Sequence, residues 1–239
     1  MQAPINAVPA RQLFRNNNKY PFIVIEGSDG TGKSTIMNHI LKHLSDLDIP
    51  VEATKEPGSP RSAICTDIRE MLFSKPYSKE MGPVSQGLLF FIDHYENARY
   101  IESIINERVI VCDRYYFSQY VYDQVKGSSQ VDANNLYTTY EERLINPDLV
   151  LHLDLDAEVA CTRANERKGK EVKQSDKAWG GSVEIAEKTR IAYNKLGEIY
   201  RTNGMNWITI PIDKQDSPEE IYNNQISPYI DDLLAMFNI

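Results

Sequence analysis

The chain has 239 residues, of which 41% are hydrophobic and 25% charged, and a formal net charge of −8. These proportions are typical of a globular protein with a sizeable core, and no apolar run approaches the roughly 18 residues of a membrane span, which argues against a membrane enzyme. The negative charge argues against a nucleic-acid partner, which needs a broad basic face. Three scattered cysteines without a CxxC motif predict neither disulfides nor zinc and fit the cytoplasm.

Residues 1–19 contain no acidic residue and carry the run Asn16-Asn17-Asn18. They lack the apolar core of a secretory signal, so we expect an N-terminal extension here and regard a targeting peptide as the less favoured interpretation. No linker or internal repeat interrupts residues 20–239, which we interpret as a single domain.

Five short apolar runs alternate with helical stretches along this domain. They predict strands at Phe22–Ile25, Val51–Thr54, Val109–Cys112, Leu149–Leu155 and Trp207–Ile212. Alternation of strand and helix predicts an α/β fold of three layers, in which helices flank a five-stranded parallel sheet. Residues 85–105 are apolar over a wide arc and predict a buried helix. Ser217 predicts the start of a C-terminal helix that Pro228 should break or restart.

The segment Gly27-Ser28-Asp29-Gly30-Thr31-Gly32-Lys33-Ser34 lies between the first predicted strand and the first helix, as a phosphate-binding P-loop does. Its glycines let backbone N–H groups turn towards a phosphate, and Lys33 can reach the outer phosphates of a nucleotide. A glycine-rich turn that carries Lys-Ser by chance is the alternative, but the strand and helix on either side disfavour it. The expected ATP-binding residues are Gly27, Ser28, Asp29, Gly30, Thr31, Gly32, Lys33, Ser34 and Thr35.

The charged pair Asp113-Arg114 follows the third predicted strand, at the sheet edge where open α/β folds bind ligands. Asp113 is a candidate ligand for Mg²⁺, directly or through water, together with the hydroxyl of Ser34. Arg114 can bridge phosphates with its planar fork of donors. A local ion pair between Asp113 and Arg114 is the alternative interpretation.

With these residues in place, the chain resembles the thymidylate kinase family, the P-loop kinases that transfer the γ-phosphoryl of ATP to the 5′-phosphate of dTMP. The resemblance runs from about Tyr20 to Ile210. It rests on the motifs Ile25–Ser34, Thr54–Gly58, Leu88-Leu89-Phe90 and Asp113-Arg114-Tyr115, with Ser118 and Tyr122. It implies a P-loop kinase fold with a mobile lid, ATP and Mg²⁺, dTDP as the product for dTTP synthesis, and a homodimer. The chain looks like a member from a large DNA virus, which would place it in the host cytoplasm.

The resemblance also implies roles at the acceptor site. Asp29 would accept a hydrogen bond from the sugar 3′-OH, Phe90 would stack on thymine, and Tyr122 would disfavour a ribonucleotide. Arg114 and Arg69 would hold the acceptor phosphate. The expected acceptor-binding residues are Asp29, Lys55, Glu56, Arg69, Phe90, His94, Arg114, Ser118, Gln119 and Tyr122. The plainer alternatives are core packing for Phe90 and Tyr122 and a helix-surface position for Arg69.

Two residues depart from the family pattern. His94 stands where the family usually has an arginine that donates to the thymine O4. A histidine can donate one hydrogen bond but offers no guanidinium fork, so thymine discrimination would be weaker or differently arranged. A buried structural histidine is the alternative. Lys55 replaces the usual arginine before Glu-Pro-Gly and keeps the positive charge.

No arginine lies among the variable P-loop positions, so we expect a lid around residues 163–181 to supply the catalytic cation. Arg163 and Arg167 lie one helical turn apart in a basic segment, and a solvated helix end is the alternative. The acceptor phosphate already carries a nucleophilic oxygen at neutral pH, because its second pKa is near ~6. The expected catalytic residues are Lys33, Asp113, Arg114, Arg163 and Arg167.

The sequence is also compatible with two other functions. A P-loop deoxynucleoside kinase would phosphorylate a 5′-hydroxyl and benefit from a carboxylate base, for which Glu56 is a candidate. A nucleotide-switch ATPase would have no small-molecule acceptor. A GTPase is disfavoured, because Asn194-Lys195-Leu196 is followed by Gly197 and not by the aspartate of the guanine-binding motif.

Overall fold

The computed structural model describes residues 17–74, 76–126, 143–171 and 182–239. Most of the predicted N-terminal extension and residues 172–181 of the predicted lid lie outside the described residues. Within the described part, no helix combines the length and the apolar character that crossing a membrane requires.

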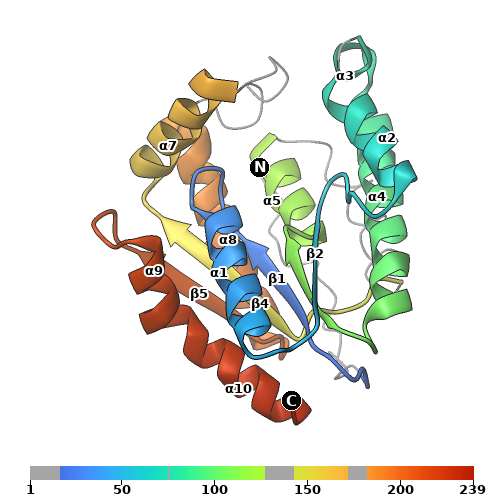
Figure 1. Cartoon of the computed structure of the whole chain (residues 1–239). Coiled ribbons are helices and arrows are strands. Elements are labelled where there is room, and N and C mark those ends of the chain that lie inside the picture. Colours follow the sequence, from blue (N-terminus) through green and yellow to red (C-terminus); the bar gives the residue numbers. More distant parts are fainter. Residues whose placement is uncertain (1–16, 75, 127–142, 172–181) are drawn as a thin grey trace.

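A five-stranded parallel sheet forms the centre of the molecule (Figure 1). Its strands are β1 (Phe22–Glu26), β2 (Val51–Lys55), β3 (Val109–Asp113), β4 (Leu149–Leu155) and β5 (Trp207–Ile212). They lie in the order β2-β3-β1-β4-β5, and every neighbouring pair is parallel. All five predicted strands are confirmed, and β1, β2 and β3 each end one residue later than the apolar pattern predicts.

Helices cover both faces of the sheet, which confirms the predicted three layers. The hydrophobic clusters place on one face α4 (Pro83–Ile104), α5 (Tyr116–Lys126) and α8 (Val183–Thr202). On the other face lie α1 (Lys33–Asp46), α9 (Pro218–Ile221), the π-helical turn η2 (Tyr222–Ile226) and α10 (Ser227–Phe237). The remaining helices are α2 (Ala63–Phe73), which packs on α4, the short α3 (Tyr77–Glu80), and α7 (Ala157–Glu171).

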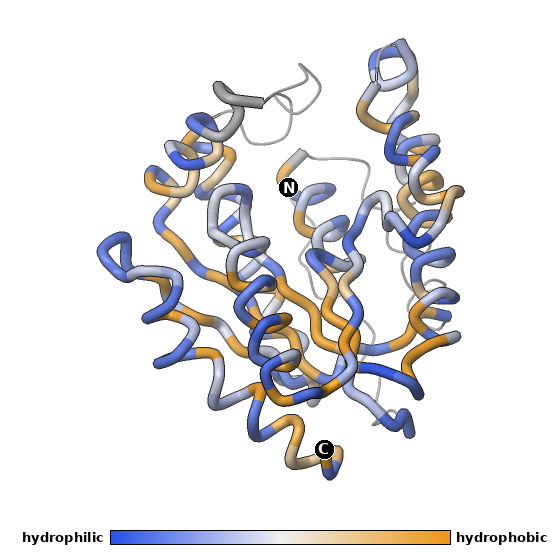
Figure 2. Tube along the Cα trace, viewed as in Figure 1, coloured by the Kyte–Doolittle hydropathy of each residue, from blue (hydrophilic) through white to orange (hydrophobic). Residues whose placement is uncertain are grey.

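Successive residues of the central strand β1 point into opposite cores. Phe22 and Val24 belong to the cluster with α4, α5 and α8, whereas Ile23 and Ile25 belong to the cluster with α1 and the C-terminal helices. All four are fully buried, so a continuous apolar run is required where an exposed sheet would show alternation. Figure 2 shows hydrophobic residues concentrated along the strands and hydrophilic ones on the outer parts of the helices.

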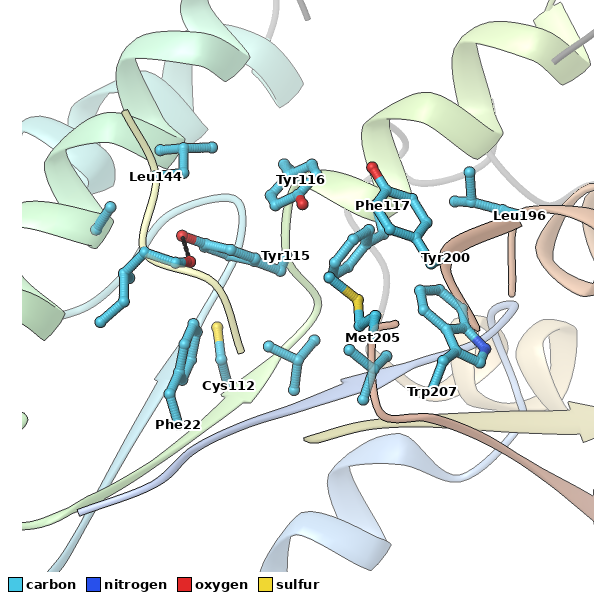
Figure 3. Packing of buried hydrophobic residues seen from close by; sticks show 14 of the residues in the cluster. Phe22, Cys112, Tyr115, Tyr116, Phe117, Leu144, Leu196, Tyr200, Met205 and Trp207 are labelled. Carbon is cyan, nitrogen blue, oxygen red and sulfur yellow. Dashed lines mark hydrogen bonds between the residues drawn. The ribbon is translucent and has the colours of Figure 1, made fainter. Parts of the chain in front are cut away.

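Aromatic side chains fix the start of α5, directly after the predicted charged pair (Figure 3). Phe117 packs edge-to-face on Trp207 and Tyr200, with ring centroids 5.1 and 4.9 Å apart. The Tyr115 hydroxyl donates to the carbonyl of Ile145 at 3.0 Å. The turn that follows β3 is therefore packed against a cluster of buried aromatic side chains.

The C-terminal segment begins and restarts as predicted. Ser217 and Glu220 form a capping box at the start of α9, because the Ser217 hydroxyl accepts from the Glu220 N–H and the Glu220 carboxylate accepts from the Ser217 N–H. Pro228 lies in the first turn of α10, where a missing N–H costs nothing, and η2 joins the two helices.

Candidate active site

Three loops meet where the central strands end. The P-loop follows β1, the pair Asp113-Arg114 closes β3, and residues 56–59 follow β2. These strands are neighbours, and Asp113 lies in register with Ile25 on one side and Lys55 on the other. A pocket of about 640 Å³ opens between the loops.

All ten residues expected to bind the acceptor line this pocket. They are Asp29, Lys55, Glu56, Arg69, Phe90, His94, Arg114, Ser118, Gln119 and Tyr122. Six residues expected at the nucleotide also line it, namely Asp29, Gly30, Gly32, Lys33, Ser34 and Thr35, together with Asp113. The fold thus brings most of the two predicted sites into one space.

The P-loop conformation depends on close backbone approach. Gly30 has φ +88°, and a Cβ there would lie 2.1 Å from the carbonyl oxygen of Ala160 on α7. The ammonium of Lys33 donates to the carbonyls of Gly27 at 3.0 Å and Ser28 at 2.8 Å. Burial, with the nearby charge of Arg114, lowers the pKa of Lys33 to about 8, so it stays mostly protonated at neutral pH. These contacts hold a cation and the N-terminus of α1 at one end of the pocket.

Arg114 is paired with the P-loop and not with its neighbour Asp113. Its Nη2 lies 2.6 Å from the carboxylate of Asp29. Its Nη1 donates to the Gly27 carbonyl at 3.0 Å, to the Ser118 hydroxyl at 3.0 Å and to the Tyr193 hydroxyl at 3.1 Å. These contacts disfavour the alternative in which Arg114 serves a local ion pair with Asp113.

The buried carboxylate of Glu26 contacts the same two hydroxyl groups as Arg114, those of Ser118 and Tyr193. It accepts hydrogen bonds from the Tyr115 N–H at 2.8 Å, the Ser118 hydroxyl at 2.7 Å and the Tyr193 hydroxyl at 2.9 Å. Burial raises the pKa of Glu26, and the charge of Arg114 opposes that rise. No sequence pattern predicted a role for Glu26 or Tyr193. Glu26 could have been noticed because it ends an otherwise apolar strand. A charged residue buried in that position needs partners, which marks it as part of a polar network.

The side chains of Ser34, the last residue of the P-loop motif, and Asp113 bring their oxygen atoms together. The Ser34 hydroxyl donates to Asp113 Oδ2 at 3.0 Å, while Asp113 Oδ1 is enclosed and has no partner among the described residues. The described residues contain no group of three or more histidine, cysteine or acidic side chains that could hold a metal. Two hard oxygens suit Mg²⁺, which keeps several of its waters and binds few protein groups.

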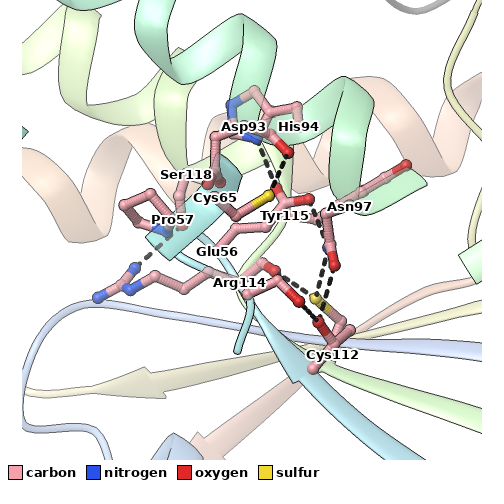
Figure 4. A network of polar contacts seen from close by, with 12 residues as sticks. Glu56, Pro57, Cys65, Asp93, His94, Asn97, Cys112, Arg114, Tyr115 and Ser118 are labelled. Carbon is pink, nitrogen blue, oxygen red and sulfur yellow. Dashed lines mark hydrogen bonds and ion pairs between the residues drawn. The ribbon is translucent and has the colours of Figure 1, made fainter. Parts of the chain in front are cut away.

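His94 belongs to a buried polar network on α4 (Figure 4). Its Nδ1 lies 2.5 Å from Glu56 Oε2, and Asn97 donates to Glu56 Oε1 at 2.8 Å. The neighbouring Asp93 accepts from the Gly58 N–H at 2.9 Å. Burial alone would lower the pKa of His94, but the adjacent Glu56 outweighs it and the pKa is raised. His94 therefore has a structural partner, and its Nε2 is left without one among the described residues.

Arg69 on α2 and Phe90 on α4 also line the pocket. Arg69 donates to the Pro57 carbonyl at 2.8 Å, and its guanidinium lies 5.1 Å above the ring of Phe73. Phe90 is buried, packs edge-to-face on Phe73 and also lines the pocket, so core packing and a ligand contact coexist at this residue. Phe73, for which no sequence pattern predicted a role, lines the pocket as well.

Of the two predicted lid cations, only Arg163 has a described side chain, and it lies apart from the pocket residues. Arg163 is on α7, with Nη2 at 3.5 Å from the carbonyl of Lys214, and it is not among the residues that line the pocket. The side chain of Arg167 lies outside the described residues.

A P-loop at the end of the central parallel strand β1, with cations gathered at the ends of β3 and β2, defines a P-loop phosphotransferase. A family model for thymidylate kinase matches residues 25–223. The chain belongs to the thymidylate kinase family. It is 30% identical to a thymidylate kinase of Francisella philomiragia (73% of this chain, 83% of the relative). It is 30% identical to one of Clostridium novyi (77% and 87%) and 29% identical to one of Caldicellulosiruptor saccharolyticus (90% and 98%).

The family assignment confirms the resemblance, the P-loop kinase fold and the enzyme class expected from the sequence. It also confirms the expected type of reaction, phosphorylation of dTMP by ATP. The deoxynucleoside kinase and the nucleotide-switch ATPase are not favoured.

Proposed function

We propose that the chain binds ATP at the P-loop and dTMP in the adjoining pocket, and transfers the γ-phosphoryl to the dTMP 5′-phosphate to give dTDP for dTTP synthesis. One observation carries this proposal: Arg69, Lys55 and Arg114 line the same pocket as the P-loop lysine. Arg114 already pairs with Asp29, but a neutral nucleoside acceptor would leave Arg69 and Lys55 without an anion among the described residues. A monophosphate acceptor supplies one.

The chemistry requires alignment and charge neutralisation more than proton abstraction. The acceptor oxygen is already ionised at neutral pH, and two anions must be held end to end. Lys33 and Arg114 provide fixed positive charge where negative charge develops. Glu56, the candidate base of a nucleoside kinase, has both carboxylate oxygens occupied by His94 and Asn97, which supports the monophosphate acceptor.

Mg²⁺ fits the pair Ser34 and Asp113, because Asp113 Oδ1 is enclosed without a partner among the described residues. Ser34 and Asp113 would hold the ion directly or through its waters. When bound, Mg²⁺ neutralises the charge of the transferring phosphates.

The remaining pocket residues suit a deoxynucleotide. Phe90 offers a ring for the base, and Asp29 offers an acceptor for the sugar 3′-OH. Tyr122 is buried beside Arg114, with its hydroxyl 3.3 Å from Nη2, where it would crowd a ribose 2′-OH. We propose that His94, Ser118 and Gln119 contact the polar edge of the thymine base.

The catalytic lid cation is proposed to be Arg163 or Arg167. Both lie on α7, whose backbone contacts the P-loop at Gly30. Closure over bound ATP would bring one of them to the transferring phosphate. Substitution of each by alanine in turn should lower kcat in one variant only.

A homodimer is proposed through the outer face of α4. Val84, Leu88, Ile92 and Tyr95 follow one another at helical spacing and are exposed by 62%, 43%, 42% and 36%. An apolar stripe of this length is typical of a surface that a second protein covers. Sedimentation should show a dimer, and Leu88→Glu with Ile92→Glu should yield monomers. A wild-type monomer at working concentration would contradict the proposal.

We place the enzyme in the cytoplasm, or the host cytoplasm for a viral member, because Cys65, Cys112 and Cys161 are all buried free thiols. No nucleic-acid or membrane partner is proposed.

The decisive experiment is a coupled ATP-to-ADP assay with dTMP, dUMP, dGMP, dCMP, UMP and thymidine as separate acceptors. The proposal expects turnover with dTMP well above that with thymidine or UMP. It also expects slow ATP hydrolysis that dTMP stimulates strongly. Equal hydrolysis with and without dTMP would favour a switch ATPase instead.

A further inference from the structure

Two residues of α5, one helical turn apart, set the direction of an amide in the pocket wall. Gln119 Nε2 donates to Asp123 Oδ2 at 2.9 Å. An aspartate carboxylate offers only acceptor atoms, so the amide nitrogen of Gln119 is the group that must face it. The amide carbonyl of Gln119 is consequently turned away from Asp123.

The carbonyl oxygen of Gln119 is available to a ligand. Gln119 lines the pocket and is only 7% exposed. Its Oε1 accepts no hydrogen bond from the described residues, yet it is not one of the polar atoms that are enclosed without a partner. Phe90 and His94 line the same pocket as Gln119. A ligand with an N–H at this position would complete the hydrogen bonding of the amide.

We infer that Asp123 is a specificity-determining positioning residue, which locks Gln119 as a hydrogen-bond acceptor and so selects pyrimidines that carry N3–H over cytosine. The inference rests on the proposed function, because it takes the deoxynucleotide base to lie in this pocket. Asp123 acts through Gln119 and does not line the pocket itself.

The selection follows from the donors and acceptors of the bases. Thymine and uracil carry a hydrogen on N3, which can be donated to Gln119 Oε1. Cytosine carries a lone pair on N3, so a locked carbonyl would face it with two acceptors and no hydrogen between them. A site built to hydrogen-bond one group rejects an analogue that lacks that group, because the buried polar atom is left unpaired.

Asp123→Asn tests whether Asp123 fixes the orientation of the Gln119 amide. An asparagine can accept from the Gln119 amide nitrogen or donate to its carbonyl, so either orientation becomes available. We expect the ratio of kcat/KM for dTMP to that for dCMP to fall by about tenfold or more. Because both substrates are measured on one preparation, partial loss of folded enzyme cancels from the ratio. Asp67→Asn, an exposed carboxylate on α2, removes the same charge and should leave the ratio unchanged.

A reciprocal exchange provides the rescue. In the double variant Gln119→Glu with Asp123→Asn, the asparagine amide donates to one glutamate oxygen, and the other oxygen again presents an acceptor to the pocket. We expect the dTMP-to-dCMP ratio to rise back towards the wild-type value, whatever happens to the absolute rates. A merely structural role for Asp123 would not be rescued by this exchange.

The outcomes separate this inference from the proposed function. A wild-type enzyme that phosphorylates neither nucleotide would overturn the proposed function. A wild-type enzyme active on dTMP, with an unchanged base ratio in Asp123→Asn or no recovery in the double variant, would overturn the role of Asp123 alone.

Discussion

The guanidinium of Arg114 lies 2.6 Å from the carboxylate of Asp29, and this ion pair joins the loop after β3 to the P-loop. Arg114 adopts φ +71°, a left-handed conformation that costs a non-glycine residue of the order of 1 kcal/mol. Its hydrogen bonds to Gly27, Ser118 and Tyr193 hold this conformation. The charge is therefore fixed beside the P-loop before any ligand arrives.

Arg114→Ala should lower kcat/KM for dTMP by at least about a hundredfold, because a preorganised cation is lost from the transition state. Steady-state kinetics with saturating ATP measures this effect. Arg114→Lys keeps the charge but loses the planar fork, and it should recover only part of the activity. Wild-type turnover in the alanine variant would exclude the assigned role.

Tyr193→Phe tests whether the buried network orients Arg114. The Tyr193 hydroxyl lies between the guanidinium of Arg114 and the carboxylate of Glu26, at 3.1 and 2.9 Å. Its removal should cost about 1 kcal/mol of folding stability and about tenfold in kcat/KM. Tyr229→Phe, at an exposed position on α10, is the matched control. Unchanged kinetics in Tyr193→Phe would show that Arg114 is positioned without this hydroxyl.

The sequence predicted what depends on local pattern. The strands could be bounded within one residue, because burial on both faces requires uninterrupted apolar runs such as Phe22–Ile25. The P-loop was recognisable for a similar reason, since Lys33 donates to carbonyls only five and six residues away. Contacts between residues that are close in sequence produce short motifs, which can be recognised without the structure.

The buried networks depend on contacts between distant segments. Tyr193 contacts Arg114 across 79 residues, and Asn97 contacts Glu56 across 41. No periodicity or motif identifies Tyr193 or Asn97 as such a partner, because both residue types are also common on helices where they have no special role. His94 could be flagged as a departure from the family pattern, but its engagement by Glu56 required the fold.

Gly58→Ala should disturb the acceptor side of the pocket. Gly58 has φ +86°, and a Cβ there would lie 2.4 Å from Cδ of Arg69. We expect a loss of about 1 to 2 kcal/mol of folding stability, and a KM for dTMP raised several-fold with the KM for ATP unchanged. Gly82→Ala is the control, because an added Cβ there meets no atom within 4 Å beyond its own chain neighbours, and its φ is −70°. Equal effects on both KM values would argue that Arg69 does not serve the acceptor specifically.

Asp93 gives folding stability a pH dependence that can be measured. This carboxyl is fully buried, one oxygen accepts from the Gly58 N–H, and the other has no partner among the described residues. Burial, together with the charge of Glu56, raises the pKa of Asp93 from 3.8 to about 7. Between these values the folded state holds a proton that the unfolded state has released, so the contribution of Asp93 to stability falls as pH rises through this range.

Asp93→Asn removes that pH dependence, because the amide is neutral throughout and still offers an oxygen to the Gly58 N–H. The melting temperature of the variant relative to wild type should therefore rise between about pH 5 and about pH 8. Thermal unfolding followed by circular dichroism at several pH values measures the difference, and Asp67→Asn should track the wild type. A constant offset between Asp93→Asn and wild type across the whole range would mean that Asp93 is ionised throughout, and that its partners in the fold stabilise the charge.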